Sequence, residues 1–385
     1  MPTREAYAVA ILVLLIFFVA FNLQSGWVYA VDALLVGLLI AGFLSAQHAV
    51  RRISISRSLP AEAVEGEPVG VALALGATGF GRRFFVEVID RVPGLQPAEV
   101  FVPVVDPRRG ARTTYVTTAV RRGIHRVGTA AIRSGGLAGI FAARREVPAP
   151  GEITIYPRYW KISRFPLAAW TPAVQTAGST RKRGGLEFYG LRDYRSGDSL
   201  RHVHWRSSAR RGALMVREFE QEVPGSVSLL LDTRPDVQRG SEVENTFEDL
   251  IRAAASVAWY VTSRGGGVRL LASTSSGPLD LTGGWRAILQ ALADLRPEGR
   301  LTPAALLHSV AIGRTPSIIA LTPDPGALAA LAASGAHVAG IVADPASYGD
   351  HAAAGPSAPI GGLGLSVCII RKGDDIGARL EQSGA

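Results

Sequence analysis

The stretch "SVSLLLD" at residues 226–232 is an apolar run that ends in a carboxylate, which is the pattern of a strand buried in a parallel sheet. A long amphipathic helix is expected next, in "ENTFEDLIRAAASVAWYVTSRGGG" (244–267), which ends in glycines. Strands are then expected at 268–273, 317–322, 337–344 and 365–371, and helices near 284–295, at 325–335 and from 374. This alternation predicts an α/β domain over residues 225–385, with a mostly parallel sheet covered on both faces.

Upstream of this region, residues 51–156 consist of short runs in which apolar and polar residues alternate. Examples are "VGVALALGA" (69–77) and "ARTTYVTTAV" (111–120), with turn-forming segments such as "DPRRG" (106–110) between the runs. Alternation with period two at this spacing predicts an antiparallel β-sandwich or a small barrel. No cluster of histidines or carboxylates in these residues has the spacing of a metal site.

Two apolar segments precede the β-rich region and are long enough to cross a bilayer. Residues 6–23 carry no charge, and residues 27–46 contain only Asp32. A second span follows the first almost at once, which argues against a cleaved signal peptide. Basic residues flank the pair, with Arg4 before it and Arg51, Arg52 and Arg57 after it. The positive-inside rule therefore predicts a two-helix transmembrane hairpin over residues 1–50, with both ends and the soluble domains on the cytoplasmic side of the cell membrane.

Composition limits the function less than these patterns do. The chain has 385 residues and a formal net charge of +9. A positive excess suits anionic lipid, nucleic acid or an acidic protein equally well. The single cysteine, Cys368, excludes an internal disulfide and a multi-cysteine zinc site.

Between the two soluble regions, residues 157–224 form a basic, turn-rich connector. It contains "GLRDYRSGDSLRHVHWRSSARRG" (190–212), in which arginines and histidines stand beside acidic and aromatic residues. Forked hydrogen bonds from the arginines to neighbouring carboxylates would fix one domain against the other. The residues expected in this joint are Arg192, Asp193, Tyr194, Gly197, Asp198, Arg201, His204, Trp205 and Arg206.

This ordered string resembles the signature of the domain-of-unknown-function 58 family, membrane-tethered bacterial proteins related to von Willebrand factor A domains. The match continues through "SSARRGALMVREFEQE" (207–222), whereas "SGGLAGIF" (134–141) lacks the Asp-Pro that the family usually carries there. The resemblance implies a von Willebrand A-like (Rossmann-like) fold for residues 225–385. It also implies pairing with a MoxR-like AAA+ ATPase, and it supplies no established reaction.

The loop after the first strand of the α/β region bears on metal binding. Von Willebrand A domains often bind a divalent cation through Asp-x-Ser-x-Ser, and this chain has "DTRPD", with Asp232 at the first position, Arg234 at the first serine and Asp236 at the second. Asp324 follows a later strand, where another carboxylate ligand is expected. These three acids could hold Mg²⁺, or Arg234 could neutralise them in a metal-free site; the metal-free site is the expectation.

Enzymatic motifs are missing from the sequence. It contains no Gly-x-x-x-x-Gly-Lys-Ser/Thr loop, no Gly-x-Ser-x-Gly elbow and no His-Glu-x-x-His helix. We therefore expect a non-enzymatic membrane-anchored scaffold that docks a protein partner. A divalent-metal-dependent adhesion-type module is the alternative, and nucleic-acid binding through the arginine-rich segment, with Tyr189, Tyr194 and Trp205 as stacking faces, is a lesser one. No nucleic-acid partner is expected, and the sequence leaves the oligomeric state open.

Overall fold

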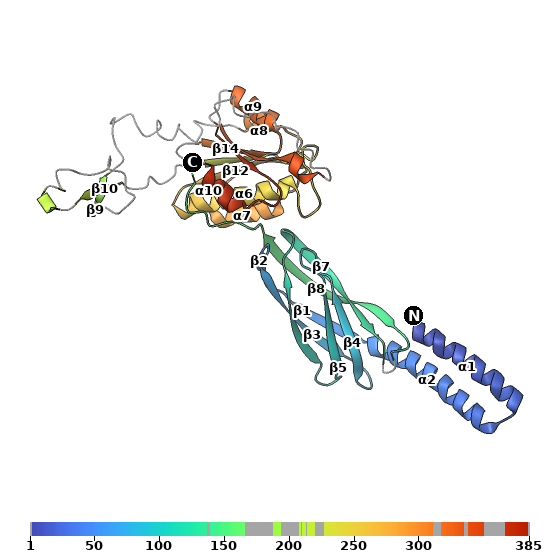
Figure 1. The fold of residues 1–385 in the computed structure, drawn as a ribbon. Coiled ribbons are helices and arrows are strands. Elements are labelled where there is room, and N and C mark those ends of the chain that lie inside the picture. Colours follow the sequence, from blue (N-terminus) through green and yellow to red (C-terminus); the bar gives the residue numbers. More distant parts are fainter. Residues whose placement is uncertain are drawn as a thin grey trace. The chain divides into compact units, whose positions relative to one another are not determined.

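The computed structural model describes residues 2–136, 139–165, 188–193, 208, 210–212, 214–219, 227–310, 317–334, 338–349 and 366–383. The chain divides into two compact units, Met1–Arg158 and Tyr159–Ala385, and both are drawn in Figure 1. The division falls two residues after the end of the expected β-rich region.

The first unit begins with two long apolar helices, α1 (Arg4–Leu23) and α2 (Gly26–Val50), of 20 and 25 residues. In each helix only 11% of the most apolar window is buried. Large apolar side chains such as Leu14 and Phe18 are more than two-thirds exposed, at 69% and 68%. A helix at the centre of a soluble domain would be mostly buried. The expected pair of apolar helices is therefore confirmed, and their exposed surface is suited to lipid.

A β-domain follows within the same unit. Its strands are β1 (Ile53–Ser58), β2 (Glu62–Val64), β3 (Pro68–Ala77), β4 (Arg83–Asp90), β5 (Ala98–Val105), β6 (Ala111–Thr118), β7 (Gly123–Ser134) and β8 (Ala143–Tyr156). They form a three-stranded sheet, β1-β3-β6, and a five-stranded sheet, β2-β8-β7-β4-β5. The pairings are antiparallel except for β2 with β8.

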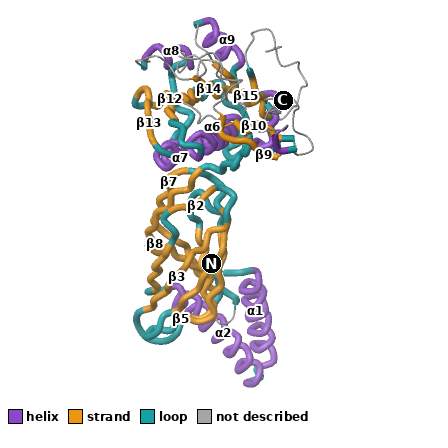
Figure 2. Tube along the Cα trace, turned by 90° about the vertical axis from the view of Figure 1, so that its left-hand side faces the viewer, coloured by secondary structure: helices purple, strands orange, loops and turns teal. Residues whose placement is uncertain are grey.

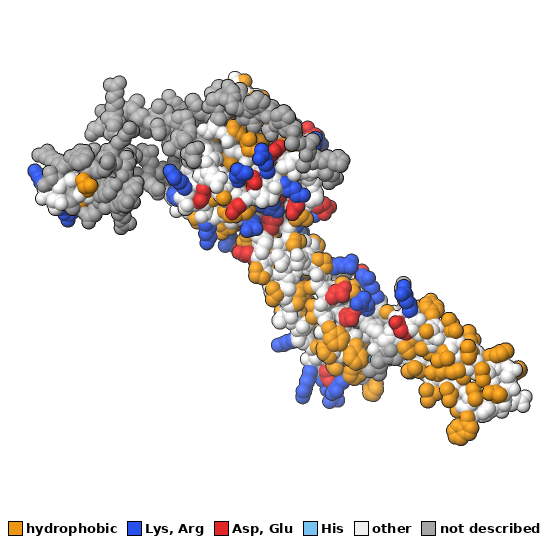
Figure 3. All heavy atoms as spheres, in the orientation of Figure 1, with side chains coloured by type: hydrophobic (Ala, Val, Ile, Leu, Met, Phe, Trp, Pro, Cys, Tyr) orange, Lys and Arg blue, Asp and Glu red, His pale blue; other side chains and the backbone are white. Residues whose placement is uncertain are grey.

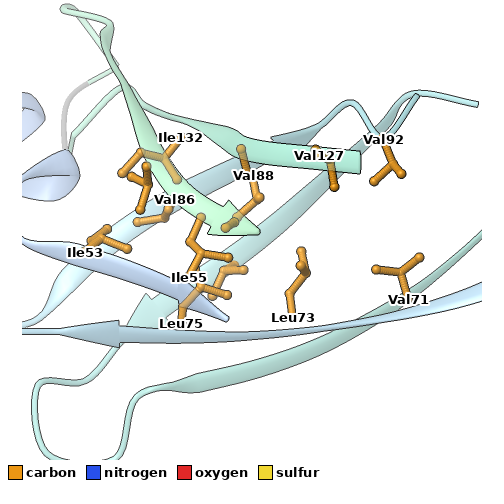
Figure 4. Packing of buried hydrophobic residues seen from close by; sticks show 14 of the residues in the cluster. Ile53, Ile55, Val71, Leu73, Leu75, Val86, Val88, Val92, Val127 and Ile132 are labelled. Carbon is orange, nitrogen blue, oxygen red and sulfur yellow. The ribbon is translucent and has the colours of Figure 1, made fainter. Parts of the chain in front are cut away.

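The two sheets of the β-domain enclose one apolar core, as in a β-sandwich. Alternate residues of β3 point into it, namely Val71, Leu73 and Leu75, and they face Val88 of β4 and Ile132 of β7 (Figure 4). The burial of β3 alternates residue by residue along the strand. This alternation is the structural counterpart of the period-two pattern in the sequence.

One charged residue close in sequence to α2 lies in this core rather than at its surface. The side chains of Arg57 in β1 and Asp90 in β4 are 0% exposed and form an ion pair of 2.6 Å. In the sequence Arg57 follows the second apolar segment together with Arg51 and Arg52, and the structure shows that its side chain is buried in the β-domain. The residue belongs to a strand with alternating burial, and its position in that alternation turns it inward.

The second unit contains the α/β domain, whose sheet has the order β13-β12-β11-β14-β15-β16. Its strands are β11 (Val227–Leu231), β12 (Val268–Thr274), β13 (Gly277–Gly283), β14 (Ser317–Thr322), β15 (Val338–Ala343) and β16 (Val367–Ile370). All neighbours pair in parallel except β12 and β13. The expected, mostly parallel sheet is confirmed.

Helices cover both faces of this sheet (Figure 2). The helices are α6 (Thr246–Ser263), α7 (Trp285–Asp294), α8 (Pro303–Ser309), α9 (Pro325–Ala333) and α10 (Ile376–Gln382), with a short 3-10 helix, η2 (Pro345–Tyr348). Helices α8 and α9 share one apolar cluster with the sheet, built around Leu230, Ile318 and Leu328. Helices α6 and α7 lie on the opposite face.

Several elements of the second unit were absent from the sequence-based expectation. Strand β13 forms a hairpin with β12 at the edge of the sheet, where only every second residue is exposed. Helix α8 has only 7 residues, too few for a clear 3.6-residue period. In the connector, β9 (Phe188–Asp193) and β10 (Met215–Phe219) pair as antiparallel strands.

Candidate functional site

The candidate site lies where the order of the parallel strands reverses. The chain passes from β11 to β12 on one side and later returns to place β14 on the other side of β11. At such a point the connections leave in opposite directions, and a crevice forms at the carboxyl ends of the two strands. Asp232 follows β11 directly, and Thr322 and Asp324 lie at the end of β14. The geometry thus brings together two of the three acids predicted for the ligand edge.

Asp232 is buried and fully engaged by hydrogen-bond donors. Its residue is 2% exposed, and Arg234 forks onto it, with Nε 3.0 Å from Oδ1 and Nη2 2.8 Å from Oδ2. Thr322 Oγ1 donates to the same Oδ2 at 2.7 Å. A bidentate arginine–carboxylate pair is both strong and geometrically specific. The Asp232 carboxylate is therefore held in place by a cation that belongs to the chain itself.

Arg234 also bridges to the second strand end. Its Nη2 lies 3.1 Å from Asp324 Oδ2, while Asp324 Oδ1 accepts from Gly326 N at 2.9 Å and caps α9. The hydrogen bond that Arg234 donates to Asp232 is the largest cause that raises the pKa of Arg234 above its usual range. One guanidinium thus joins the carboxyl ends of β11 and β14.

The loop that carries Arg234 is fixed from several sides. Gln238 Nε2 donates to the carbonyl oxygens of Asp232 at 3.1 Å and Arg234 at 3.2 Å. Gly299 N donates to Thr233 O at 2.9 Å, and Thr233 Oγ1 donates to Ser273 O. A Cβ at Gly299 would lie 2.1 Å from Thr233 Oγ1, so only glycine allows this approach. Arg234 is therefore presented by a rigid loop, which favours a structural role for its ion pairs.

The residues present do not fit a divalent cation. The Arg234 guanidinium stands between the two carboxylates that a metal would need, and a like charge opposes metal binding. Asp236 is exposed, and Arg239 Nη1 donates to its main-chain carbonyl oxygen at 2.8 Å. Within the described ranges there is no group of three or more His, Cys, Asp and Glu side chains placed to hold a metal. Asp232 and Asp324 are thus brought together by a guanidinium, and Asp236 stays outside their network.

Most of the predicted joint lies outside the described residues. This applies to Tyr194, Gly197, Asp198, Arg201, His204, Trp205 and Arg206. For Arg192 and Asp193 the structure describes the main chain, which pairs with Val216 and Met215 in the β9–β10 sheet. The arginine-rich joint therefore remains a prediction.

A different segment at the start of the second unit does dock on the α/β domain. Residues 159–165, which we call the strap, cross the face formed by α6 and α10. Trp160 N donates to Ser256 Oγ at 3.0 Å, and a Cβ at Gly377 would come within 2.6 Å of the Trp160 ring. The N and Oγ of Ser163 both donate to Glu381 Oε1, at 2.6 and 2.9 Å. Sequence reasoning missed the strap, although its aromatic residues in "YWKISRF" (159–165) were a signal for burial.

Ile162 and Phe165 anchor the strap with exposures of only 2% and 4%. We expect Trp160→Ala to raise the rate of tryptic cleavage after Lys161 several-fold, because the loss of packing against α10 frees the strap locally. The measurement is limited trypsin digestion of the full chain, with cleavage sites mapped by mass spectrometry. Cleavage after the exposed Arg108 of the β-domain is the internal control and should not change. Equal rates of cleavage after Lys161 in the Trp160→Ala variant and in the unsubstituted protein would contradict the docking of the strap on the α/β domain.

A buried acid in the apolar helix α2 completes the set of unusual polar groups. Asp32 in α2 is 8% exposed, and its Oδ1 has no hydrogen-bond partner within the described residues. The burial of Asp32 places its carboxylate against protein.

The fold and site thus define a chain with two apolar helices, a two-sheet β-domain and an α/β domain whose switch point is spanned by an arginine. Residues 190–307 match the family described as "Protein of unknown function DUF58", so the resemblance predicted from the arginine-rich signature is confirmed. The chain is also 25% identical over 164 residues to "Uncharacterized protein YeaD" of Bacillus subtilis (strain 168). That alignment covers 42% of this chain and 39% of the relative.

Two solved structures each match 26% of the chain. The CARDB domain of PF1109 from Pyrococcus furiosus matches 26% of this chain and 94% of its own, with 11% identity and a TM-score of 0.18. A beta-glucosidase from Listeria innocua, in complex with gluconolactone, matches 26% of this chain and 16% of its own, with 18% identity and a TM-score of 0.15. With TM-scores this low, neither structure informs the function of this chain.

Proposed function

We propose that this protein is a non-enzymatic, membrane-anchored scaffold whose α/β domain docks a protein partner. The observation that carries the proposal is the closed switch point. In open α/β sheets the carboxyl edge is where small ligands bind, and here Arg234 joins Asp232 to Asp324 across that edge. Because Arg234 neutralises these two carboxylates, the carboxyl edge offers a rigid surface for contact with a protein.

The sheet topology supports a von Willebrand A-like fold for this domain. Its order is β13-β12-β11-β14-β15-β16, with a single antiparallel strand at one edge. Asp232 occupies the first position of the metal loop that the family resemblance implies, and Arg234 and Asp236 stand where serines are expected. On this proposal the domain keeps the fold and the binding edge, and an internal cation takes the place of the metal.

Helices α1 and α2 support anchorage in the cell membrane. Their outward side chains are apolar along most of their length, and both helices are long enough to cross the hydrocarbon core. Arg4 precedes α1 and Arg51 and Arg52 follow α2, and by the positive-inside rule these charges support a cytoplasmic location of the soluble domains.

A MoxR-like AAA+ ATPase is the proposed partner, by resemblance to the family. On this proposal the partner supplies the energy for any mechanical work. The scaffold supplies the membrane anchor and the docking surface.

The test is site-specific photo-crosslinking in native membranes. A photoreactive amino acid at Asp236, which is exposed beside the carboxyl edge, is expected to capture an AAA+ ATPase identified by mass spectrometry. The matched control is Ser263, exposed at the far end of α6 and so at the opposite edge of the sheet. Absence of an AAA+ ATPase from the Asp236 crosslinks, or equal yields from both positions, would count against the proposal.

A further inference from the structure

The helix pair and the β-domain are docked firmly on each other. Thr3 N and Oγ1 both donate to Ile140 O, at 3.1 and 2.6 Å. Phe43 of α2 packs edge to face against Phe141, with ring centroids 5.6 Å apart. A Cβ at Gly136 would lie 2.4 Å from Ser45 Oγ. These contacts hold the β-domain in one orientation relative to the two helices.

A buried arginine fixes the β3–β4 loop beside the end of α2. Arg83 is 2% exposed, and its Nη1 donates to Phe80 O at 2.9 Å and to Gly81 O at 2.7 Å. Its Nε lies 3.3 Å from Arg51 O, just after α2, and its Nη1 contacts His48 Nε2 in the last turn of the helix. The loop is therefore held at the level where α2 ends.

The tip of that loop is a phenylalanine that no neighbour covers. Phe80 is 96% exposed, and the flanking Gly79 and Gly81 have φ of 93° and 81°, values that favour glycine. Exposing a large apolar ring to water at a rigid loop tip is unfavourable in free energy, and placing the ring in a lipid interface is favourable. The loop thus has the form of an interfacial anchor.

Basic residues surround this tip. Arg51, Arg52 and Arg82 are exposed beside it, and Arg82 Nε bonds Asp106 Oδ2 at 3.2 Å, which ties in the β5–β6 hairpin. That hairpin carries exposed basic residues of its own, Arg108 and Arg109. Figure 3 shows basic side chains gathered at the end of the β-domain next to the apolar helices. We call Phe80 with these five arginines the basal patch.

We infer that the basal patch lies on the anionic lipid surface of the same bilayer that α1 and α2 cross. Phe80 enters the interface, and the arginines contact lipid phosphates. The arginines of the basal patch complement the negative charge of lipid phosphates. Because α2 leads directly into the patch and fixes it at head-group depth, anionic lipid is favoured over a protein surface. This inference rests on the proposed membrane anchorage.

The test uses spin labels on the full chain, reconstituted in vesicles of phosphatidylcholine mixed with phosphatidylglycerol. Burial raises the pKa of the Cys368 thiol to about 11, so the native cysteine reacts slowly near neutral pH. Labels are placed by Phe80→Cys in the patch, Val116→Cys as control and Leu15→Cys in the middle of α1. Val116 is 73% exposed but lies toward the other end of the β-domain, where it pairs with Gly70.

Depth is measured by electron paramagnetic resonance as accessibility to oxygen relative to a water-soluble nickel complex. We expect several-fold higher relative oxygen accessibility at position 80 than at position 116. Arg82→Glu with Arg108→Glu should remove this difference, whereas Arg126→Glu, on the exposed start of β7, should not. If the accessibility at position 15 is that of lipid and the accessibility at position 80 is that of water, the inference is overturned while the anchorage stands. The patch would then be a protein-docking surface. A water-like position 15 would overturn the anchorage, and the inference with it.

Discussion

Replacing Asp90 with alanine is expected to destabilise the β-domain by about 3–5 kcal/mol, because it would leave the Arg57 guanidinium buried without its counter-ion. Arg57 Nε lies 2.9 Å from Asp90 Oδ2, and Nη2 lies 2.6 Å from Oδ1. The guanidinium also donates to the carbonyl oxygens of Ala149 in β8 and Thr129 in β7. It cannot reach water without separating those strands from the core.

Tyr115 adds a third group to this buried network. Its hydroxyl donates to Asp90 Oδ2 at 2.7 Å, and burial, helped by the bond to Asp90, raises the pKa of Tyr115 well above its usual value. The tyrosine therefore stays a neutral donor. The double variant Arg57→Met with Asp90→Leu removes both charges together, and we expect it to recover most of the stability lost in the single variant.

Hydrogen exchange followed by mass spectrometry reports on this domain within the full chain. For Asp90→Ala, the protection of amides in β4 and β7 should fall by roughly a hundred- to several thousand-fold, which corresponds to the expected free-energy loss. Amides of the α/β domain should not change. Glu152→Ala removes a surface ion pair to Arg126, with side chains 54% and 79% exposed, and should have little effect. Similar losses in Glu152→Ala and Asp90→Ala would refute the argument.

The sequence was sufficient for the elements whose hydrophobic pattern is long or regular. The apolar runs of α1 and α2, the alternation along β3 and the strand–helix alternation after residue 225 each specify one kind of element. It also placed Asp232 and Asp324 at the same edge, because carboxyl ends of neighbouring parallel strands meet there. What these cases share is that local pattern alone determines the result.

Features that depend on tertiary partners could not be predicted from the sequence. Arg57 is close in sequence to Arg51 and Arg52, and only its partner in β4 shows why it turns inward. The strap docks on two helices that are distant from it in sequence. Trp160 contacts Ser256 of α6, 96 residues away, and Ser163 contacts Glu381 of α10, 218 residues away. No local pattern encodes such pairings. The position of the Arg234 guanidinium between Asp232 and Asp324 depends in the same way on tertiary structure.

Replacing Arg234 with alanine is expected to destabilise the α/β domain by about 2–4 kcal/mol, because Asp232 would remain buried as an unpaired carboxylate. The Arg234 side chain is 13% exposed and that of Asp232 is 0% exposed, so water screens this pair little. The Asp324 side chain is 35% exposed, and its loss should destabilise the domain less than the loss of Arg234. Arg239→Ala is the matched control, since this exposed arginine of the same loop bonds only main-chain oxygens within the described residues.

Arg234→Ser tests whether the guanidinium takes the place of a cation. The variant supplies a hydroxyl beside Asp232, which makes an oxygen-rich site for Mg²⁺. We expect millimolar Mg²⁺ to restore protection of β11 and β14 amides in Arg234→Ser and to leave the unsubstituted protein unchanged, because a ligand stabilises only the state that binds it. Isothermal titration should give heat with Arg234→Ser alone. If the unsubstituted protein instead binds Mg²⁺ and Asp232→Ala abolishes the heat, the edge is a metal-dependent binding site and Arg234 must move aside to admit the ion.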